Sequence, residues 1–458
     1  MVQAIIHFKI YITMKKFFKY AMLLMAAGTL GMSFSSCSSD DDNSGNTAEE
    51  QNNALKDMTG KYLSDVVFPT YKSLAAETQD LYQLITALNT KLQAGTAVAQ
   101  GDIDAICTSY KAARKYWEQS EAFLYGAASD FEIDPHIDTW PLDVPTLAKD
   151  LSDDKKIESL KGASANGRAR DFLTSENLGF HGIEFIFFRD GKNRDVAIFN
   201  NDATENYTYK GEEYFKGMTV TGKEEVVFAT AVACDLRDKC WQLEVAWLGN
   251  DAAADHRARV SEMAKVYNDF ETTVQKNGLS YGADLQAAAT PTSTQASWKK
   301  VVETILVSGC SNICAEVADQ KMGQAYRAAV GKAEQRKDEE TGEMVEDDPN
   351  YIESPYSHNS FKDFYDNIMS IQNSLYNNVE GSQWTNNSIM AYLTKYNAAQ
   401  ANELSTKLQA ALNALNACRN SGKAFVDAPG DASVKAAMDA ISELDACLNA
   451  TSAWVLRN

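Results

Sequence analysis

At residues 178–188 the chain reads LGFHGIEFIFF, and the rest of the sequence is organised around this stretch. Read as a helix, it places His181 and Glu184 three residues apart, on one face. Their neighbours are apolar, so the imidazole and the carboxylate are expected to be partly buried. A buried charge is costly unless it has a partner. His181 and Glu184 therefore either satisfy each other inside a core or bind a metal ion.

The composition limits the class of protein. The formal net charge is −20, which argues against nucleic-acid binding, because that function needs a basic surface. An acidic surface instead suits the accumulation of cations. Only eight prolines occur in 458 residues, and good helix-forming residues recur in long runs. The composition thus favours a helical protein.

The apolar pattern predicts an all-α fold of two tandem helical bundles with no significant β-sheet. Apolar residues recur at helical spacing on both sides of a stretch rich in Gly, Ala, Thr and Ser, residues 276–293. We place the domain boundary there, with an N-terminal bundle over 51–280 and a C-terminal bundle over 281–458. We expect the chain to be a monomer.

The N-terminus reads as a targeting segment. Met14-Lys15-Lys16 begins a basic region, an apolar stretch follows, and Ser35-Ser36-Cys37 resembles a bacterial lipobox. Residues 1–36 are then a leader and lipoprotein signal peptide, Cys37 is lipidated, and 37–50 form an acidic flexible tether. The alternative is a plain signal peptide cut elsewhere. The lipobox predicts a protein anchored by lipid in the bacterial cell envelope, at the outer membrane, facing the periplasm or the surface.

Several chemistries are excluded by missing motifs. The sequence has no H-E-x-x-H, no H-x-x-E-H, no Walker A loop and no G-x-S-x-G elbow. Seven cysteines remain after Cys37, so they cannot all pair, and we expect most of them to be buried apolar residues. With only five histidines, a metal site must depend on carboxylates, which suit iron(III), manganese or calcium.

Three acids upstream could complete such a site. Glu118 and Glu121 lie three residues apart near the end of a predicted helix, and Asp138 lies in the loop that follows. Each has a simpler interpretation. The two glutamates can form a solvated acidic face, and Asp138 can be a turn or cap residue.

Four elements in order make the chain resemble the imelysin family. They are Gly179-Phe180-His181-Gly182-Ile183-Glu184 (G-x-H-x-x-E), the helix W-E-Q-S-E-A-F over 117–123, the loop I-D-T-W-P-L-D over 137–143, and E-S-P-Y-S-H-N-S over 353–360. The resemblance spans roughly residues 50–455. It implies a two-domain helical envelope protein with a metal site at Glu121, Asp138, His181 and Glu184, and with Glu118 as an additional acid.

The resemblance leaves two functions open. The family is tied to iron-regulated uptake and is related to the periplasmic component of elemental iron uptake, which implies a non-catalytic protein that binds iron or an iron chelate and serves an uptake transporter. It is also classed with metallopeptidases, which implies zinc and proteolysis. A peptidase needs an open water position and a general base, and no acid in the sequence is marked as that base. We therefore favour iron binding without catalysis, and residues with a catalytic role stay unknown.

Overall fold

The computed structural model describes residues 44–458, except 202, 206, 210–211 and 338–341. The predicted leader, Cys37 and the first residues of the predicted tether lie outside the described residues. Helices make up most of the described chain, and its strands are confined to three short hairpins, so the predicted all-α class is confirmed. Helix α2 begins at Ser44, inside the segment that we expected to be a flexible tether.

The N-terminal half is built on long helices joined by short helical turns. Its helical elements are α2 (Ser44–Tyr62), η1 (Leu63–Val67), α3 (Phe68–Gln93), α4 (Gln100–Glu118), η2 (Glu121–Phe123), α5 (Ala127–Asp130), α6 (Asp134–Ile137), α7 (Val144–Leu151), α8 (Asp154–Ala163), η3 (Ala169–Asp171), η4 (Ser175–Asn177), α9 (Gly179–Phe187), α10 (Val196–Asn200), α11 (Gly222–Leu248), η5 (Gly249–Asp251), α12 (Ala254–Met263) and α13 (Tyr281–Gln286). Two hairpins, β1 (Phe188–Arg189) with β2 (Lys192–Asn193) and β3 (Thr208–Tyr209) with β4 (Glu212–Glu213), are antiparallel.

The first long helix is interrupted where the sequence contains Pro69. Proline lacks the N–H that an α-helix needs and clashes with the preceding turn. The structure accommodates it with the π-helical turn η1 directly before α3. The irregularity before Pro69 therefore takes the form of a π turn between α2 and α3, and Pro69 itself lies in the first turn of α3.

Helix α11 is the centre of the N-terminal half, with almost every residue buried. A helix buried on all sides must find partners for its charged residues. Asp235 contacts His136 and Arg170, and Lys239 donates to Asp269 over 2.6 Å. These pairs hold α6, η3 and the segment after α12 against the central helix.

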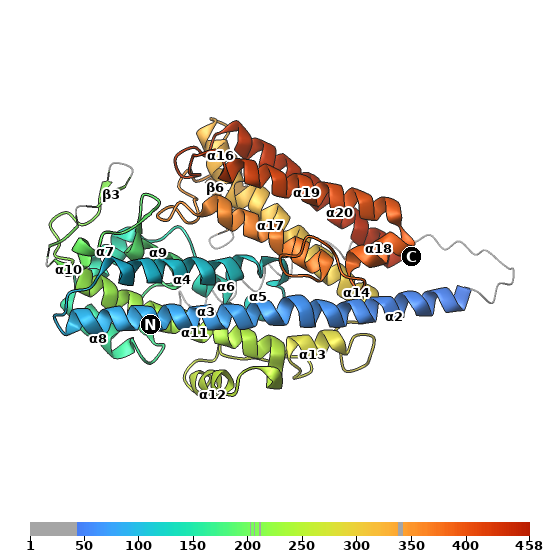
Figure 1. The fold of residues 1–458 in the computed structure, drawn as a ribbon, viewed down its shortest axis with the longest axis horizontal. Coiled ribbons are helices and arrows are strands. Elements are labelled where there is room, and N and C mark those ends of the chain that lie inside the picture. Colours follow the sequence, from blue (N-terminus) through green and yellow to red (C-terminus); the bar gives the residue numbers. More distant parts are fainter. Residues whose placement is uncertain (1–43, 202, 206, 210–211, 338–341) are drawn as a thin grey trace.

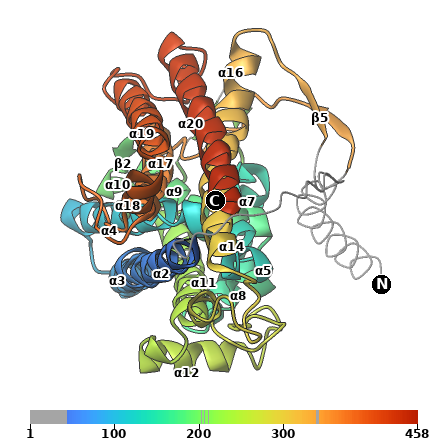
Figure 2. The same cartoon turned by 90° about the vertical axis from the view of Figure 1, so that its right-hand side faces the viewer.

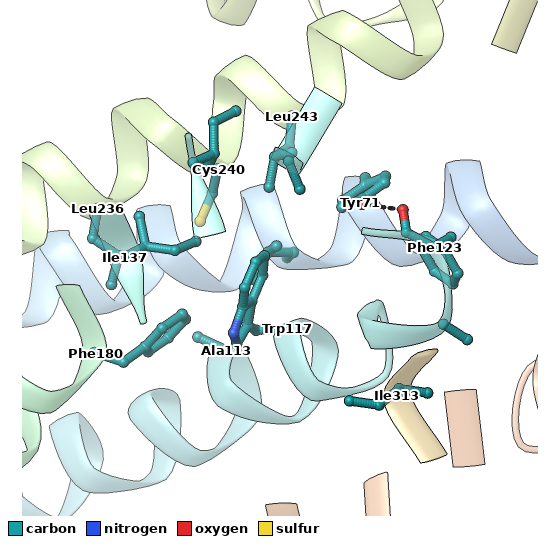
Figure 3. Packing of buried hydrophobic residues seen from close by; sticks show 14 of the residues in the cluster. Tyr71, Ala113, Trp117, Phe123, Ile137, Phe180, Leu236, Cys240, Leu243 and Ile313 are labelled. Atoms are coloured by element: carbon teal, nitrogen blue, oxygen red, sulfur yellow. Dashed lines mark hydrogen bonds between the residues drawn. The ribbon is translucent and has the colours of Figure 1, made fainter. Parts of the chain in front are cut away.

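The core of this half also contains a row of aromatic side chains, which Figure 3 shows from close by. The indole of Trp117 stacks on Phe180, with ring centroids 6.5 Å apart, so α4 and α9 pack closely. Tyr71 of α3 meets the ring of Phe123 edge-on at 5.4 Å. Helices α3, α4, α9 and α11 thus share one core.

The C-terminal half is a second group of packed helices. It comprises α14 (Trp298–Glu303), η6 (Thr304–Ser311), α15 (Asn312–Ala315), η7 (Glu316–Lys321), α16 (Gly323–Ala329), α17 (Ser360–Tyr376), α18 (Ile389–Tyr396), α19 (Ala398–Arg419) and α20 (Ala432–Arg457), with the hairpin β5 (Gln335–Lys337) and β6 (Met344–Glu346). The run Trp298–Ala329 is long and apolar enough by composition to cross a membrane, but most of its apolar window is buried in the protein.

The two halves lie side by side along the long axis, as Figures 1 and 2 show. Helix α17 packs on α4, and η6 packs on η2. A Cβ on Gly309 of η6 would lie 2.0 Å from the carbonyl oxygen of Ala122, so only glycine permits this approach. Tyr281 of α13, just past the predicted boundary, donates to Asp130 of the N-terminal half over 2.6 Å.

The seven cysteines in the described residues are all buried and unpaired. This agrees with the expectation that most of them are small core residues. Burial raises the pKa of their thiols, to about 12 for Cys107, so they are poor nucleophiles.

Candidate metal centre

The four predicted ligands and the additional acid Glu118 come together where the two halves meet. Helix α4 and η2 supply Glu118 and Glu121, the loop after α6 supplies Asp138, and α9 supplies His181 and Glu184. All five side chains are buried. The sequence therefore identified residues that share one centre, although they are up to 66 positions apart in the numbering of the chain.

The glycine of G-x-H-x-x-E places α9 against the loop that carries Asp138. Gly179 has a φ of +68°, and a Cβ there would lie 1.9 Å from the carbonyl oxygen of Ile137. A larger residue would push the start of α9 away. As a result, Nε2 of His181 lies 3.1 Å from Oδ1 of Asp138.

Glu184 fixes the ring of His181. The Nδ1–H group of His181 donates to Oε2 of Glu184 over 3.1 Å. The other oxygen, Oε1, accepts from the backbone N–H of Tyr356 and from both the N–H and the hydroxyl of Ser357, over 2.7–3.1 Å. Both oxygens are therefore in use, and Glu184 has the contacts of a carboxylate that orients a histidine ligand rather than those of a ligand.

Nε2 of His181 faces the centre, next to Oδ1 of Asp138. It makes no hydrogen bond among the described residues, and its contact with Oδ1 of Asp138 over 3.1 Å is an ion pair when the ring is protonated. Burial lowers the pKa of His181, but the carboxylates of Asp138 and Glu184 outweigh burial and raise the pKa to about 9. Without a metal, the ring is therefore protonated at neutral pH.

Asp138 has an ionised carboxylate. Burial opposes ionisation, but the Arg114 guanidinium and His181 hold the pKa of Asp138 well below its usual range. Oδ1 pairs with Nη1 of Arg114, and Oδ2 accepts from the indole N–H of Trp117 over 2.7 Å. The tryptophan of the W-E-Q-S-E-A-F helix thus holds the loop aspartate in place.

Glu353, from the C-terminal half, is the residue that the sequence analysis missed as a candidate ligand. It is fully buried, and its Oε1 pairs with Nη2 of Arg114 and lies 3.3 Å from Nζ of Lys321. Its Oε2 has no hydrogen-bond partner among the described residues. The E-S-P-Y-S-H-N-S element was recognised in the sequence, but nothing in its pattern distinguished the glutamate as a ligand.

Asp138, His181 and Glu353 form a three-residue set whose donor atoms lie within 4.8 Å of one another. Oδ1 of Asp138 and Nε2 of His181 lie 3.1 Å apart. At this separation both atoms can bind the same ion with metal–ligand bonds of about 2.0–2.2 Å. The set offers an imidazole nitrogen, which can coordinate once it has lost its proton, and a carboxylate oxygen with no hydrogen bond among the described residues. These residues fit a metal ion, and two carboxylates with one imidazole suit a hard or intermediate cation.

Glu118 and Glu121 extend the acidic centre. Together with Asp138 they form a second set with donor atoms within 4.8 Å. Glu118 lies 2.5 Å from Nη2 of Arg114, and Glu121 lies 3.5 Å from Nζ of Lys321. Burial raises the pKa of both glutamates, because these cations only partly offset the loss of water. The structure therefore brings both residues to the centre, each next to a resident cation.

A cavity of about 330 Å³ adjoins the centre. His181 lines it together with the aromatic rings of Trp140, Tyr214 and Tyr356. Trp140 follows Asp138 by two residues, and Tyr356 follows Glu353 by three. The same segments therefore carry the candidate ligands and the cavity wall.

A protein-family model and a curated protein both match parts of this chain. The model of the imelysin family (peptidase M75) matches residues 67–448. Iron-regulated protein A of Synechococcus elongatus is 33% identical over 127 residues, which are 28% of this chain and 30% of that protein. The match thus spans less than a third of the curated relative's length.

A solved structure shows the same fold, and a second is a weaker match. A protein from Parabacteroides distasonis, described as an iron-regulated protein A precursor, has a TM-score of 0.63 at 20% identity, covering 88% of this chain and 95% of that one. An imelysin-like protein from Psychrobacter arcticum has a TM-score of 0.47 at 12% identity, covering 86% and 93%. The first of these confirms the arrangement of the helices.

Proposed function

The chain belongs to the imelysin family, and on that premise we propose that it is a non-catalytic protein that binds a metal ion, iron before zinc, for uptake into the cell. The ion is the cargo, and Asp138, His181 and Glu353 hold it. Glu184 orients His181, while Glu118 and Glu121 lie beside it as further buried acids. A partner transporter would receive the ion.

One observation carries this proposal: the buried Nε2 of His181 and Oε2 of Glu353 make no hydrogen bond among the described residues, and an ionised aspartate lies beside them. Unpartnered buried polar atoms are rare, because each costs free energy. A cation bound to Nε2 of His181 and Oε2 of Glu353 would satisfy both atoms. It would also offset the excess of acids over cations in the centre.

Iron is favoured over zinc on two grounds. Carboxylates outnumber imidazole among the donors, and that ratio suits harder ions than zinc. In addition, the curated relative that matches part of this chain is named for its regulation by iron. The transfer of that link to this chain belongs to the proposal.

The geometry supports binding over proteolysis. A zinc peptidase needs a water-accessible metal and a free general base. His181 is 1% exposed and Glu353 is 0% exposed, so an extended peptide has no direct access to them. Glu184, the acid of the H-x-x-E motif, has both oxygens occupied by His181, Tyr356 and Ser357.

Lipid anchoring through Cys37 completes the proposal. It would hold the protein in the cell envelope, at the outer membrane, where it can take up iron or an iron chelate. The support is the lipobox-like sequence before Cys37 and the acidic residues that follow it.

A direct experiment separates the two functions. Protein purified without chelators or affinity-tag metal is analysed for bound metals, titrated with iron and zinc, and incubated with an unfolded protein substrate. We expect binding of one ion per chain, tighter for iron, and no cleavage. Metal-dependent cleavage that disappears in His181→Ala would establish the peptidase instead.

A further inference from the structure

The cavity beside His181 is larger and less polar than a bare ion requires. Its volume of about 330 Å³ falls at the lower end of the roughly 300–1,000 Å³ typical of small-molecule sites. Besides the aromatic rings of Trp140, Tyr214 and Tyr356, its wall includes Pro141 and Pro355. A lining of this kind binds flat apolar groups.

The cavity wall is held in place before any ligand arrives. The ring of Trp140 packs against Tyr351 with centroids 3.9 Å apart, and that of Tyr356 meets Phe185 edge-on at 5.1 Å. The backbone N–H of Tyr356 donates to Glu184, which in turn orients His181. A molecule in the cavity would therefore touch both these aromatic rings and the imidazole of His181.

The charge of the lining selects among possible ligands. Among the described residues that line the cavity there is no Arg or Lys, and Glu212 is its one carboxylate. Besides the imidazole of His181, a tricarboxylate anion would find no cationic side chain among these described residues, and it would meet the repulsion of Glu212. The rings of Trp140, Tyr214 and Tyr356 favour a chelator that carries an aromatic ring, because such a ring can stack against them.

We propose that the cavity receives the metal as a complex with a small aromatic chelator of the catechol type, with one or two rings. The ring lies against Trp140, Tyr214 and Tyr356, and the metal contacts His181. This inference rests on the proposed metal site and specifies the form in which the ion arrives.

The test compares iron(III) alone, iron(III) as its one-to-one catechol complex, and iron(III) citrate. Equilibrium dialysis measures retained iron, and the absorption band of iron–catecholate reports whether catechol stays with the protein. We expect catechol to be retained together with iron and to raise iron retention several-fold. Citrate should compete for iron and should not be retained.

Two variants locate the chelator. Trp140→Ala and Tyr214→Ala each remove one ring from half-buried positions, and we expect each to weaken retention of the catechol complex roughly three- to ten-fold. Binding of iron alone should change by less than about two-fold, because neither residue is a metal ligand. Trp384→Ala is the matched control, since Trp384 is 39% exposed and does not line the cavity.

The outcomes separate the two levels of the proposal. If wild type retains neither iron nor its catechol complex, the proposed metal function itself fails. If iron binds but catechol is not retained, or if Trp140→Ala and Tyr214→Ala behave as Trp384→Ala does, the chelate inference is overturned while metal binding stands. Retention of citrate with iron, equal to that of catechol, would also overturn it.

Discussion

Oε1 of Glu184 accepts hydrogen bonds from both the backbone N–H and the hydroxyl of Ser357, which lies 173 residues further along the chain. This contact joins the H-x-x-E helix of the N-terminal half to the segment that carries Glu353. The same carboxylate orients His181 through its other oxygen. The histidine and the glutamate proposed as ligands are thus connected through one acid.

The role of Glu184 as a positioning residue predicts a partial effect of its substitution. Glu184→Gln keeps the side-chain shape but weakens the hold on His181, so iron affinity should fall about ten- to a hundred-fold without being abolished. Ser357→Ala should cost about 1–2 kcal/mol of unfolding free energy, with a smaller effect on affinity. Calorimetric titration and urea unfolding measure both. A loss in Glu184→Gln as large as that in His181→Ala would identify Glu184 as a ligand.

Glu353 is predicted to be a ligand from the C-terminal half. Substitution of a residue that only orients a ligand reduces metal affinity by at most roughly a hundred-fold. Glu353 is proposed as a ligand itself, so Glu353→Gln should reduce iron affinity by more than that. Glu262→Gln, at a side chain that is 66% exposed, is the control and should leave affinity unchanged. Equal affinities in the two variants would remove Glu353 from the site.

Arg114 is the main counter-ion of the centre without metal. It pairs with Glu118, Asp138 and Glu353, and the loss of one partner from such a buried group costs about 3–5 kcal/mol. Arg114→Met should therefore destabilise the metal-free protein strongly. Iron should raise the unfolding free energy of Arg114→Met more than that of wild type, because in the variant it supplies the missing positive charge. Urea unfolding with and without iron tests this, and an iron effect equal to that in wild type would contradict it.

Metal binding should release protons. The pKa of His181 is raised to about 9 in the metal-free centre, so the ring carries a proton at pH 7 that a bound ion must displace. We expect the release of about one proton per ion at pH 7 and an apparent affinity that rises with pH up to about 9. Calorimetry in buffers of different ionisation enthalpy counts these protons. No release at pH 7 would mean that the metal does not bind Nε2 of His181.

The lipid anchor predicts the location of the protein. In Cys37→Ser the acylation site is lost, so the protein should appear in the soluble fraction or remain unprocessed. Membrane fractionation and mass spectrometry of the mature N-terminus measure this. Processed Cys37→Ser protein that still fractionates with membranes would exclude the anchor.

Helical periodicity was enough to predict the all-α class, because helices fix which residues share a face. The short hairpins, such as β1 with β2, were not predicted, since two-residue strands carry no alternating pattern. The helical start at Ser44 was also missed, because its polar residues resemble a tether.

The site was predictable in part for a related reason. His181 and Glu184 are visible as a pair because one helix places them together, and Asp138 came from the resemblance of its loop. Arg114 and Glu353 contact each other although they lie 239 residues apart in the sequence. No local sequence pattern could therefore predict that both belong to the site. The sequence also could not show that Glu184 orients His181 while Glu353 is the proposed ligand. That difference arises because Ser357 donates hydrogen bonds to Glu184, which is a tertiary contact.

The most direct test of the central claim is an anomalous difference map at the iron edge from crystals grown or soaked with iron. We predict one strong peak that contacts Nε2 of His181 and carboxylate oxygens of Asp138 and Glu353, with Glu184 still hydrogen-bonded to Nδ1 of His181. A peak elsewhere in the protein would contradict the claim. The absence of a peak would also contradict it if elemental analysis finds no bound iron in the soaked crystals.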